Sequence, residues 1–129
     1  MIVKHFKLSQ PEKVRLIRIK AKTGIQNWNI ICRWALCWSL AEPTPPGGID
    51  PLSDSNVEMD WSTFAGEYSE IYEAIIRQRC INDGFGDDEK TLAKYFRLHL
   101  SRGINHYSSR DVLKNCADLL KSAVEKEVE

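Results

Sequence analysis

The sequence lacks the short motifs on which common active sites and metal centres are built. It has no His-Glu-x-x-His, no nucleophile elbow and no P-loop, so the enzymes that depend on these motifs are not indicated. Its four cysteines form no Cys-x-x-Cys pair, and no histidine stands at metal-ligand spacing from them. The three histidines are scattered. Nothing in the sequence therefore predicts catalysis, a metal or a cofactor.

Long apolar runs are also missing. The most apolar segment, residues 28–41, is too short to cross a bilayer and contains Arg33. The N-terminus shows no signal peptide, because Lys4 and Lys7 interrupt its apolar run. We therefore expect a cytoplasmic protein without membrane contact. In a reducing compartment the cysteines should be free thiols, and Cys32 and Cys37 should be buried packing residues.

Acids are scarce at the start of the chain, and bases are absent from its middle. Residues 1–41 hold eight lysines and arginines against one acid, Glu12. Residues 42–73 hold eight acids and no lysine or arginine, and the whole chain has a formal net charge of zero. This asymmetry indicates a polyanion-binding surface or electrostatic pairing between subunits. The alternative is an ordinary solvated face.

Most of the early positive charge falls in a predicted helix over residues 10–23. Ser9 and Glu12 can form a capping box at its start, and Pro11 fits the first turn. Gly24 is a natural stop.

Helical spacing divides the side chains of this helix into flanks and stripes. Its cations fall on two opposite flanks: Lys13 and Lys20 on one, and Arg15, Arg18 and Lys22 on the other. Two apolar stripes lie between the flanks, one of Val14, Ile17 and Ala21 and the other of Leu16 and Ile19. A simple surface helix has one stripe. Two stripes predict contact with the chain's own core and with a second subunit.

The next predicted helix, residues 27–41, is apolar in nearly every direction, with Arg33 as its single charge. A helix that is apolar all round should be buried all round. In a chain of 129 residues such burial is easiest in an oligomer.

The remaining pattern predicts a mainly α, compact single domain over residues 1–129. A short strand is predicted before residue 10, with Phe6 and Leu8 on one face and His5 and Lys7 on the other. A long Pro- and Gly-rich loop follows the apolar helix. Further helices are predicted over residues 62–81, 88–107 and 109–126 from their apolar spacing. Gly103 either interrupts its helix or permits a close contact.

The strand–helix–helix order at the N-terminus also occurs in ribbon-helix-helix regulators. In those proteins, strands from two subunits pair and enter the major groove of DNA. Here the strand would present His5 and Lys7 outward. A transcriptional regulator of this type is therefore one interpretation of the sequence.

Three segments of the chain form a recognisable set: KAKTGIQNWNIICRWALCWSLAEP (20–43), EMDWSTFAGE (58–67) and FRLHLSRGI (96–104). They resemble the DndE family of bacterial DNA sulfur-modification, or phosphorothioation, proteins. The most characteristic pieces are the Thr23-Gly24 pair, the Cys32–Leu40 run, the Gly66-Glu67 pair and the Arg102-Gly103 pair. The likeness extends over nearly the whole chain, although Trp34 and Trp38 stand where leucine is usual.

The resemblance implies a small helical protein without catalytic activity of its own. It implies a tetramer that binds duplex DNA, preferably nicked, through surface lysines. Its partners would be the other proteins of the sulfur-modification system, including a cysteine desulfurase, a sulfurtransferase-like protein and an ATPase.

An enzyme that carries sulfur on Cys32 or Cys37 is a third interpretation of the sequence. The candidate DNA-binding residues are Lys7, Lys13, Arg15, Arg18, Lys20 and Lys22, and the sequence leaves open which flank contacts DNA.

Overall fold

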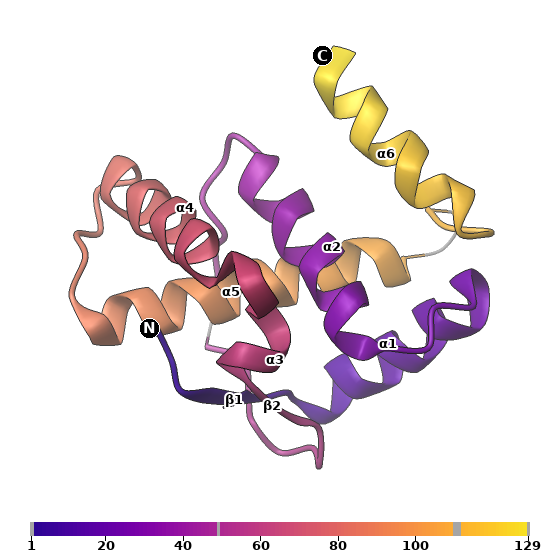
Figure 1. Ribbon diagram of the computed structural model, residues 1–129, viewed down its shortest axis with the longest axis horizontal. Helices are drawn as coiled ribbons and strands as arrows, with labels where there is room; N and C mark the ends of the chain where they lie inside the picture. The colour runs from indigo at the N-terminus through magenta and orange to yellow at the C-terminus, as the bar shows by residue number, and fades with distance from the viewer. Residues whose placement is uncertain (1, 49, 110–111, 129) are drawn as a thin grey trace.

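The computed structural model describes residues 2–48, 50–109 and 112–128, without the side chains of 125–128, and is mainly helical (Figure 1). The mainly α single domain with a short N-terminal strand is thereby confirmed. Its elements in chain order are β1 (His5–Lys7), α1 (Gln10–Thr23), α2 (Trp28–Ala41), β2 (Glu58–Asp60), α3 (Trp61–Ala65), a 3-10 turn η1 (Gly66–Tyr68), α4 (Ser69–Asn82), α5 (Glu89–Ser108) and α6 (Ala117–Val128).

The N-terminal strand pairs within its own chain. β1 and β2 are antiparallel, with Phe6 opposite Met59, and both of these side chains are buried. His5 and Lys7 face outward as predicted. Strand β2 was not predicted from the sequence, because three residues are too few for a visible alternation.

Helix α1 begins and ends where its local signals predict. The Ser9 hydroxyl accepts a hydrogen bond from the Glu12 amide at 3.2 Å, and the Glu12 carboxylate accepts one from the Ser9 amide at 2.8 Å. Gly24 has a φ of 75°, the left-handed conformation that ends many helices. Both signals are short-range, which is why the sequence was sufficient to place this helix.

Helices α2 and α5 cross at the centre of the molecule (Figure 1). Gly103 of α5 lies against the backbone of Ala35 in α2, so the close-contact interpretation of Gly103 is confirmed. The predicted ranges 27–41 and 88–107 agree with these two helices to within one residue at each end.

The predicted helix over 62–81 is divided in the structure. Gly66 has φ 58° and ψ −138°, a conformation that side chains with a Cβ rarely adopt. It ends α3, and the chain passes through η1 before α4 begins at Ser69. The apolar period continues across the break, from Phe64 to Tyr72, and conceals it in the sequence.

The last predicted helix begins too early. Residues 110–111 lie outside the described residues, and residues 112–116 form turns and bends. Helix α6 starts at Ala117 and extends away from the body of the molecule (Figure 1). The hydroxyls of Tyr107 and Ser122 are 3.0 Å apart and link α6 to the end of α5.

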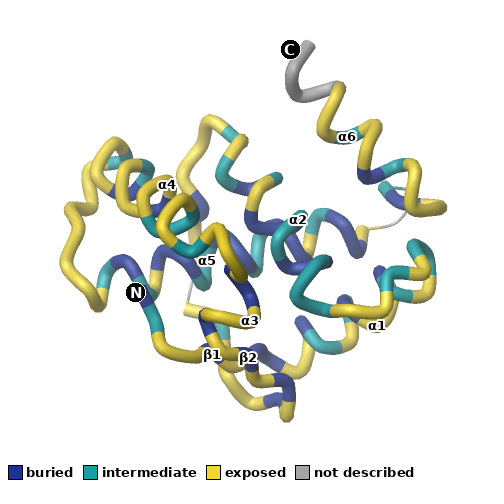
Figure 2. The backbone as a smooth tube through the Cα atoms, viewed as in Figure 1, coloured by how far each residue is buried: buried dark blue, intermediate teal, exposed yellow. Residues whose placement is uncertain are grey.

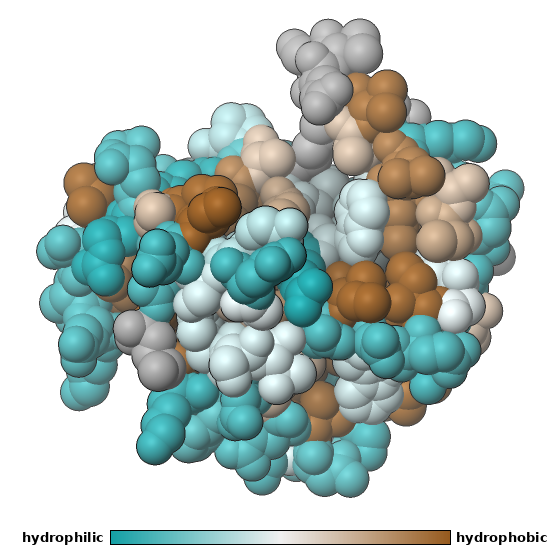
Figure 3. All heavy atoms as spheres, in the orientation of Figure 1, coloured by the Kyte–Doolittle hydropathy of each residue, from teal (hydrophilic) through white to brown (hydrophobic). Residues whose placement is uncertain are grey.

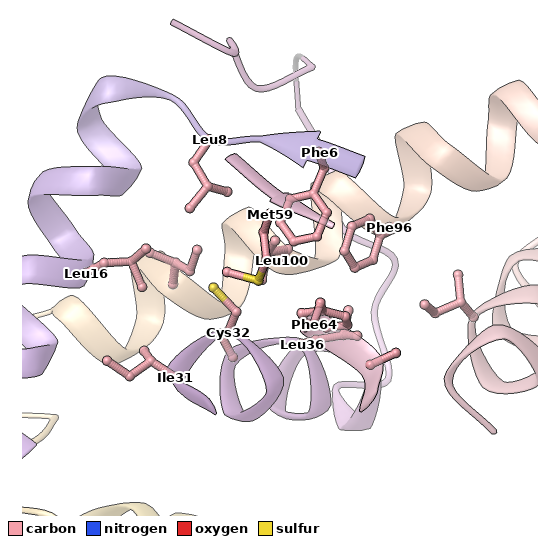
Figure 4. Close-up of a cluster of buried hydrophobic side chains, with 14 of the residues drawn as sticks. Phe6, Leu8, Leu16, Ile31, Cys32, Leu36, Met59, Phe64, Phe96 and Leu100 are labelled. Atoms are coloured by element: carbon pink, nitrogen blue, oxygen red, sulfur yellow. The ribbon is translucent and has the colours of Figure 1, made fainter. Parts of the chain in front are cut away.

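One hydrophobic core joins the sheet to the central helices. Phe96 of α5 meets Phe6 and Phe64 edge-on, with ring centroids 5.0 and 5.4 Å apart. This is a favoured arrangement of aromatic rings. Cys32 points from α2 into the same cluster (Figure 4). Buried positions concentrate on α2 and α5, whereas α4 and α6 are largely exposed (Figure 2).

Within a single chain, α2 buries only one face, so the burial all round that was expected in an oligomer is not reached by the monomer alone. Its buried residues are Ile31, Cys32, Ala35, Leu36 and Ser39. On the opposite side Trp34 and Trp38 are half-buried and Cys37 is exposed. Within the single chain the prediction of a buried Cys37 is therefore wrong, because one chain has too little structure to cover both faces of α2.

Candidate nucleic-acid interface

Helix α1 presents an exposed apolar stripe between two cationic flanks. Leu16 and Ile19 are fully buried, whereas Val14 and Ile17 are 47% and 50% exposed. Of the two predicted apolar stripes, only the one formed by Leu16 and Ile19 therefore lies in the core. The outward stripe places Lys13 and Lys20 on one side and Arg15, Arg18 and Lys22 on the other.

The two flanks have different surroundings. Lys13 donates a hydrogen bond to the Asn56 side chain at 2.6 Å, within the acid-rich segment that holds Asp54 and Glu58. The Asp54 carboxylate also accepts a hydrogen bond from the backbone at the start of α1. The Lys13 flank therefore borders negative charge, which weakens its attraction for an anion.

The other flank faces α5. Arg18 donates to the backbone carbonyl of Ser108 at 3.3 Å, near the C-terminal end of α5. Arg15 lines a cleft against the same helix. Among the described residues, no ion pair involves a cation of α1. The positive charge of this helix is therefore not neutralised within the described part of the chain.

Other arginines are used inside the fold. Arg97 of α5 makes a two-pronged ion pair with Glu12, with N–O distances of 2.7 and 3.1 Å, and Glu12 is buried. Arg33 of α2 donates to the carbonyls of Thr63 and Phe64 near the end of α3. These guanidinium groups hold elements together, so they are poor candidates for DNA contact.

Two further arginines hold the end of α2. Arg79 donates to the carbonyl of Leu40 at 2.7 Å, and Arg102 donates to that of Ser39 at 2.7 Å. Both also donate to the carbonyl of Thr44 in the following loop. The carbonyls at the end of a helix lack partners within it; that of Ser39 also accepts a hydrogen bond from the Glu42 amide at 3.1 Å. These hydrogen bonds could not be predicted from the sequence, because Arg79 and Arg102 lie far along the chain from the end of α2.

Lys7 is separated from the α1 flanks. In the β1–β2 register it stands opposite Glu58, which also lies 3.5 Å from the imidazole of His5. Lys7 lines a cleft together with Lys94 and Arg97, and Asp50 lies in the same cleft. The structure thus places Lys7 among charges of both signs rather than beside the other predicted DNA-binding residues.

The cleft that Arg15 lines beside α5 was not predicted from the sequence. We call it the α1–α5 cleft; it has a volume of about 310 Å³ and lies between α1, α5 and the loop after α2. Its polar lining consists of Arg15, Ser101, Arg102 and Asn105, and Gly47 and Pro51 come from the loop. In the sequence Arg102 stands out only as part of a family segment, since nothing local links it to the distant Arg15.

The two cysteines of α2 differ in exposure. Burial, and then the nearby Glu12 carboxylate, raises the pKa of the Cys32 thiol to about 12. Cys37 is exposed at the edge of an apolar groove beside Trp34 and Trp38. Partial burial also raises the pKa of Cys37, against a lowering hydrogen bond from Tyr72. Raised thiol pKa values disfavour the nucleophilic thiolate in both.

His99 is buried and neutral. Its Nδ1 lies 2.8 Å from the Ser39 hydroxyl, which itself accepts a hydrogen bond from Arg102. Burial, followed by the charges of Arg102 and Arg79, lowers the pKa of His99 to about 3. The described residues contain no cluster of His, Cys, Asp or Glu able to hold a metal ion. None of the described helices has the length and apolarity needed to cross a bilayer.

Comparisons with known proteins point to one family. A family profile described as DNA sulphur modification protein DndE matches residues 5–115. Among solved structures, the chain is similar to DndE from Escherichia coli B7A, described as involved in DNA phosphorothioation modification. The TM-score is 0.67 at 24% sequence identity, over 81% of this chain and 97% of that chain. A search of curated proteins gave no match. Because the profile extends over most of the sequence, the chain belongs to the DndE family of DNA sulphur modification proteins.

Proposed function

We propose that this protein is the non-catalytic DNA-binding subunit of the DNA phosphorothioation machinery. It binds the phosphate backbone of duplex DNA, preferably nicked, through the basic surface of α1. It acts in the cytoplasm, where a sulfurtransferase-like protein and an ATPase of the same system are its partners. The observation that carries the proposal is the cationic α1, whose charges have no acidic partner among the described residues.

The flank of Arg15, Arg18 and Lys22 is the side that we propose faces DNA. It lies along α5 and the α1–α5 cleft, where Arg102 adds a further positive charge. The flank of Lys13 and Lys20 instead borders the acid-rich segment around Asp54. Phosphate would therefore be attracted more strongly to the first flank.

The burial and the raised pKa of the Cys32 thiol support a non-catalytic role for this protein. Cys32 lies inside the core with a pKa raised to about 12, so it stays protonated and shielded from sulfur donors. In this proposal the partner proteins supply the sulfur and the energy, and this subunit holds the DNA. Lysine and arginine at phosphate carry no base information, so binding should be nearly blind to sequence.

The outer face of α2 supports assembly into a homo-oligomer, in our proposal a tetramer. Trp34, Cys37 and Trp38 line an apolar groove of about 300 Å³ beside α6. Hydrophobic side chains continue along α6 on the same side of the molecule (Figure 3). Exposed apolar surface of this kind is characteristic of an interface. Several subunits would also bring several α1 helices to one DNA molecule.

The structure favours this function over a ribbon-helix-helix regulator. In such regulators the N-terminal strand pairs with the same strand of a second subunit. Here β1 is three residues long and pairs with β2 of its own chain.

A gel-shift experiment on intact, nicked and single-stranded DNA at two salt concentrations tests the proposed function. We expect binding to both duplexes, tighter to the nicked one because it bends more easily, and a steep loss of affinity with salt. Duplexes of unrelated sequence should bind equally well. Absence of duplex binding contradicts the proposal, and strong discrimination between sequences supports the regulator instead.

A further inference from the structure

The polar side chains of the α1–α5 cleft have unused hydrogen-bonding capacity. Among the described residues, the side chains of Arg15, Ser101 and Asn105 take part in no hydrogen bond or ion pair, yet all three line the cleft. Arg102 makes four hydrogen bonds, to Ser39 and Thr44. A guanidinium has five N–H groups, so at least one of its donors remains. The cleft therefore presents several donors without internal acceptors.

The charge of the cleft is equally one-sided. Its lining contains two guanidinium groups and no described carboxylate. Burial, and then the nearby Arg79, lowers the pKa of Arg102, and the carboxylates of Glu42 and Asp83, which lie outside the lining, offset this only in part. A bound anion would supply the missing compensation.

The pattern of donors and charges fits a particular class of anion. A phosphate monoester carries a charge of about −1.5 to −2 near pH 7 and offers three acceptor oxygens. An internal phosphodiester of DNA carries a single charge and is linked to sugars on both sides. A recess lined by two cations and by the side chains of Ser101 and Asn105 therefore matches the monoester better.

We propose that the α1–α5 cleft binds a phosphate monoester, with Arg15 and Arg102 as its cationic ligands and Ser101 and Asn105 as hydrogen-bond donors. Two sources share this chemistry: the terminal 5′-phosphate of a DNA strand, and a free mononucleotide. The first source rests on the proposed function, because DNA binding would bring the strand end to the cleft. The second does not require DNA binding.

Calorimetric titration with thymidine 5′-monophosphate, and with thymidine as the unphosphorylated control, tests the cleft directly. The protein should bind the monophosphate and not the nucleoside. Arg15→Gln should weaken binding at least about tenfold, as loss of one charge-assisted hydrogen bond would. Lys90→Gln removes one charge near the start of the same α5 helix, outside the cleft, and should change affinity less than about twofold. The double variant Ser101→Ala/Asn105→Ala, which leaves all charges in place, should also weaken binding.

A parallel measurement identifies the source of the phosphate. Duplexes nicked at one position, with either a 5′-phosphate or a 5′-hydroxyl at the nick, are compared for wild type and Arg15→Gln. An Arg15-dependent preference for the 5′-phosphate supports the strand end, and monophosphate binding without that preference supports a free mononucleotide. Equal binding of thymidine and its monophosphate, or equal weakening by Arg15→Gln and Lys90→Gln, overturns the proposal. Failure of the proposed DNA-binding function appears separately, as loss of binding to intact duplex while the monophosphate titration persists.

Discussion

A Cβ atom placed on Gly103 in α5 would lie 1.9 Å from the carbonyl oxygen of Ala35 in α2. The next two atoms it would meet, at 2.3 and 2.7 Å, also belong to the Ala35 backbone. Backbone cannot rotate aside as a flexible side chain can. The two central helices are therefore as close as their main chains allow, and this contact fixes how α2 and α5 cross.

Gly103→Ala should consequently destabilise the protein strongly. The added methyl group forces α2 and α5 apart, and overpacking of this kind costs about 1–3 kcal/mol or more. Urea unfolding followed by circular dichroism measures the change. Gly47→Ala is a matched control, because its Cβ would meet nothing within 4 Å and its φ is not positive. A Gly103→Ala protein as stable as the control would show that the helices can separate without cost.

Breaking the buried ion pair between Glu12 and Arg97 should cost far more stability than breaking an exposed pair on the same helix. The side chains of Arg97 and Glu12 are 12% and 1% exposed. Arg97→Met leaves the Glu12 carboxylate buried without its partner, which typically costs about 3–5 kcal/mol. Lys94→Met breaks the exposed pair with Asp50 and should cost less than about 1 kcal/mol. Chemical denaturation of both variants tests this, and similar costs would contradict it.

His99 should make the protein less stable in mild acid. Its folded-state pKa is about 3, below the unfolded value of roughly 6.5, so the unfolded state takes up a proton that the folded state refuses. Stability from this group is complete above roughly pH 6.5 and declines as the pH falls towards 3, by up to about 1.4 kcal/mol per pH unit.

Urea unfolding of wild type and His99→Gln between pH 7.5 and 5 measures this dependence. The comparison is between slopes against pH, so any fixed cost of the substitution cancels. The variant should show the flatter slope. Equal slopes would mean that His99 takes up its proton as readily in the folded protein as in the unfolded chain.

Assembly should be visible in the reactivity of the thiols. Cys116 is exposed and should react with a thiol reagent, whereas the buried Cys32 should not. Cys37 is exposed in the single chain but lies on the proposed interface, so it should be protected in the oligomer. Light scattering at micromolar concentration should show the oligomer itself. A monomer there, with Cys37 reacting as fast as Cys116, would contradict the proposed assembly.

The sequence was most informative where its signals are local. Ser9, Glu12 and Gly24 act within one helical turn of their own positions, and they placed α1 correctly. Gly66 is also a local signal, but the apolar period from Phe64 to Tyr72 continues across it and suggested a single helix. The continuous hydrophobic pattern therefore led to the prediction of one helix, although Gly66 ends α3.

Contacts between distant segments could not be predicted from the sequence. The strand β2 is defined by its pairing with β1, and three residues carry no period of their own. The α1–α5 cleft joins Arg15 to Arg102, which only the packing of α1 on α5 brings together. The outer face of α2 was predicted to be buried because it is apolar. The sequence does not state whether the covering surface belongs to the same chain or to another one.

The claim that α1 is the DNA-binding surface is tested most directly by duplex affinity over a series of salt concentrations. The measurement compares wild type with two neutralised sets, Arg15→Gln/Arg18→Gln/Lys22→Gln and Lys13→Gln/Lys20→Gln. We predict that the first set binds more weakly and that its log–log salt slope is flatter by roughly 0.9 for each phosphate that the variant no longer neutralises. The second set should resemble wild type. If neither set changes affinity or slope, or if only the second does, the proposed surface is wrong.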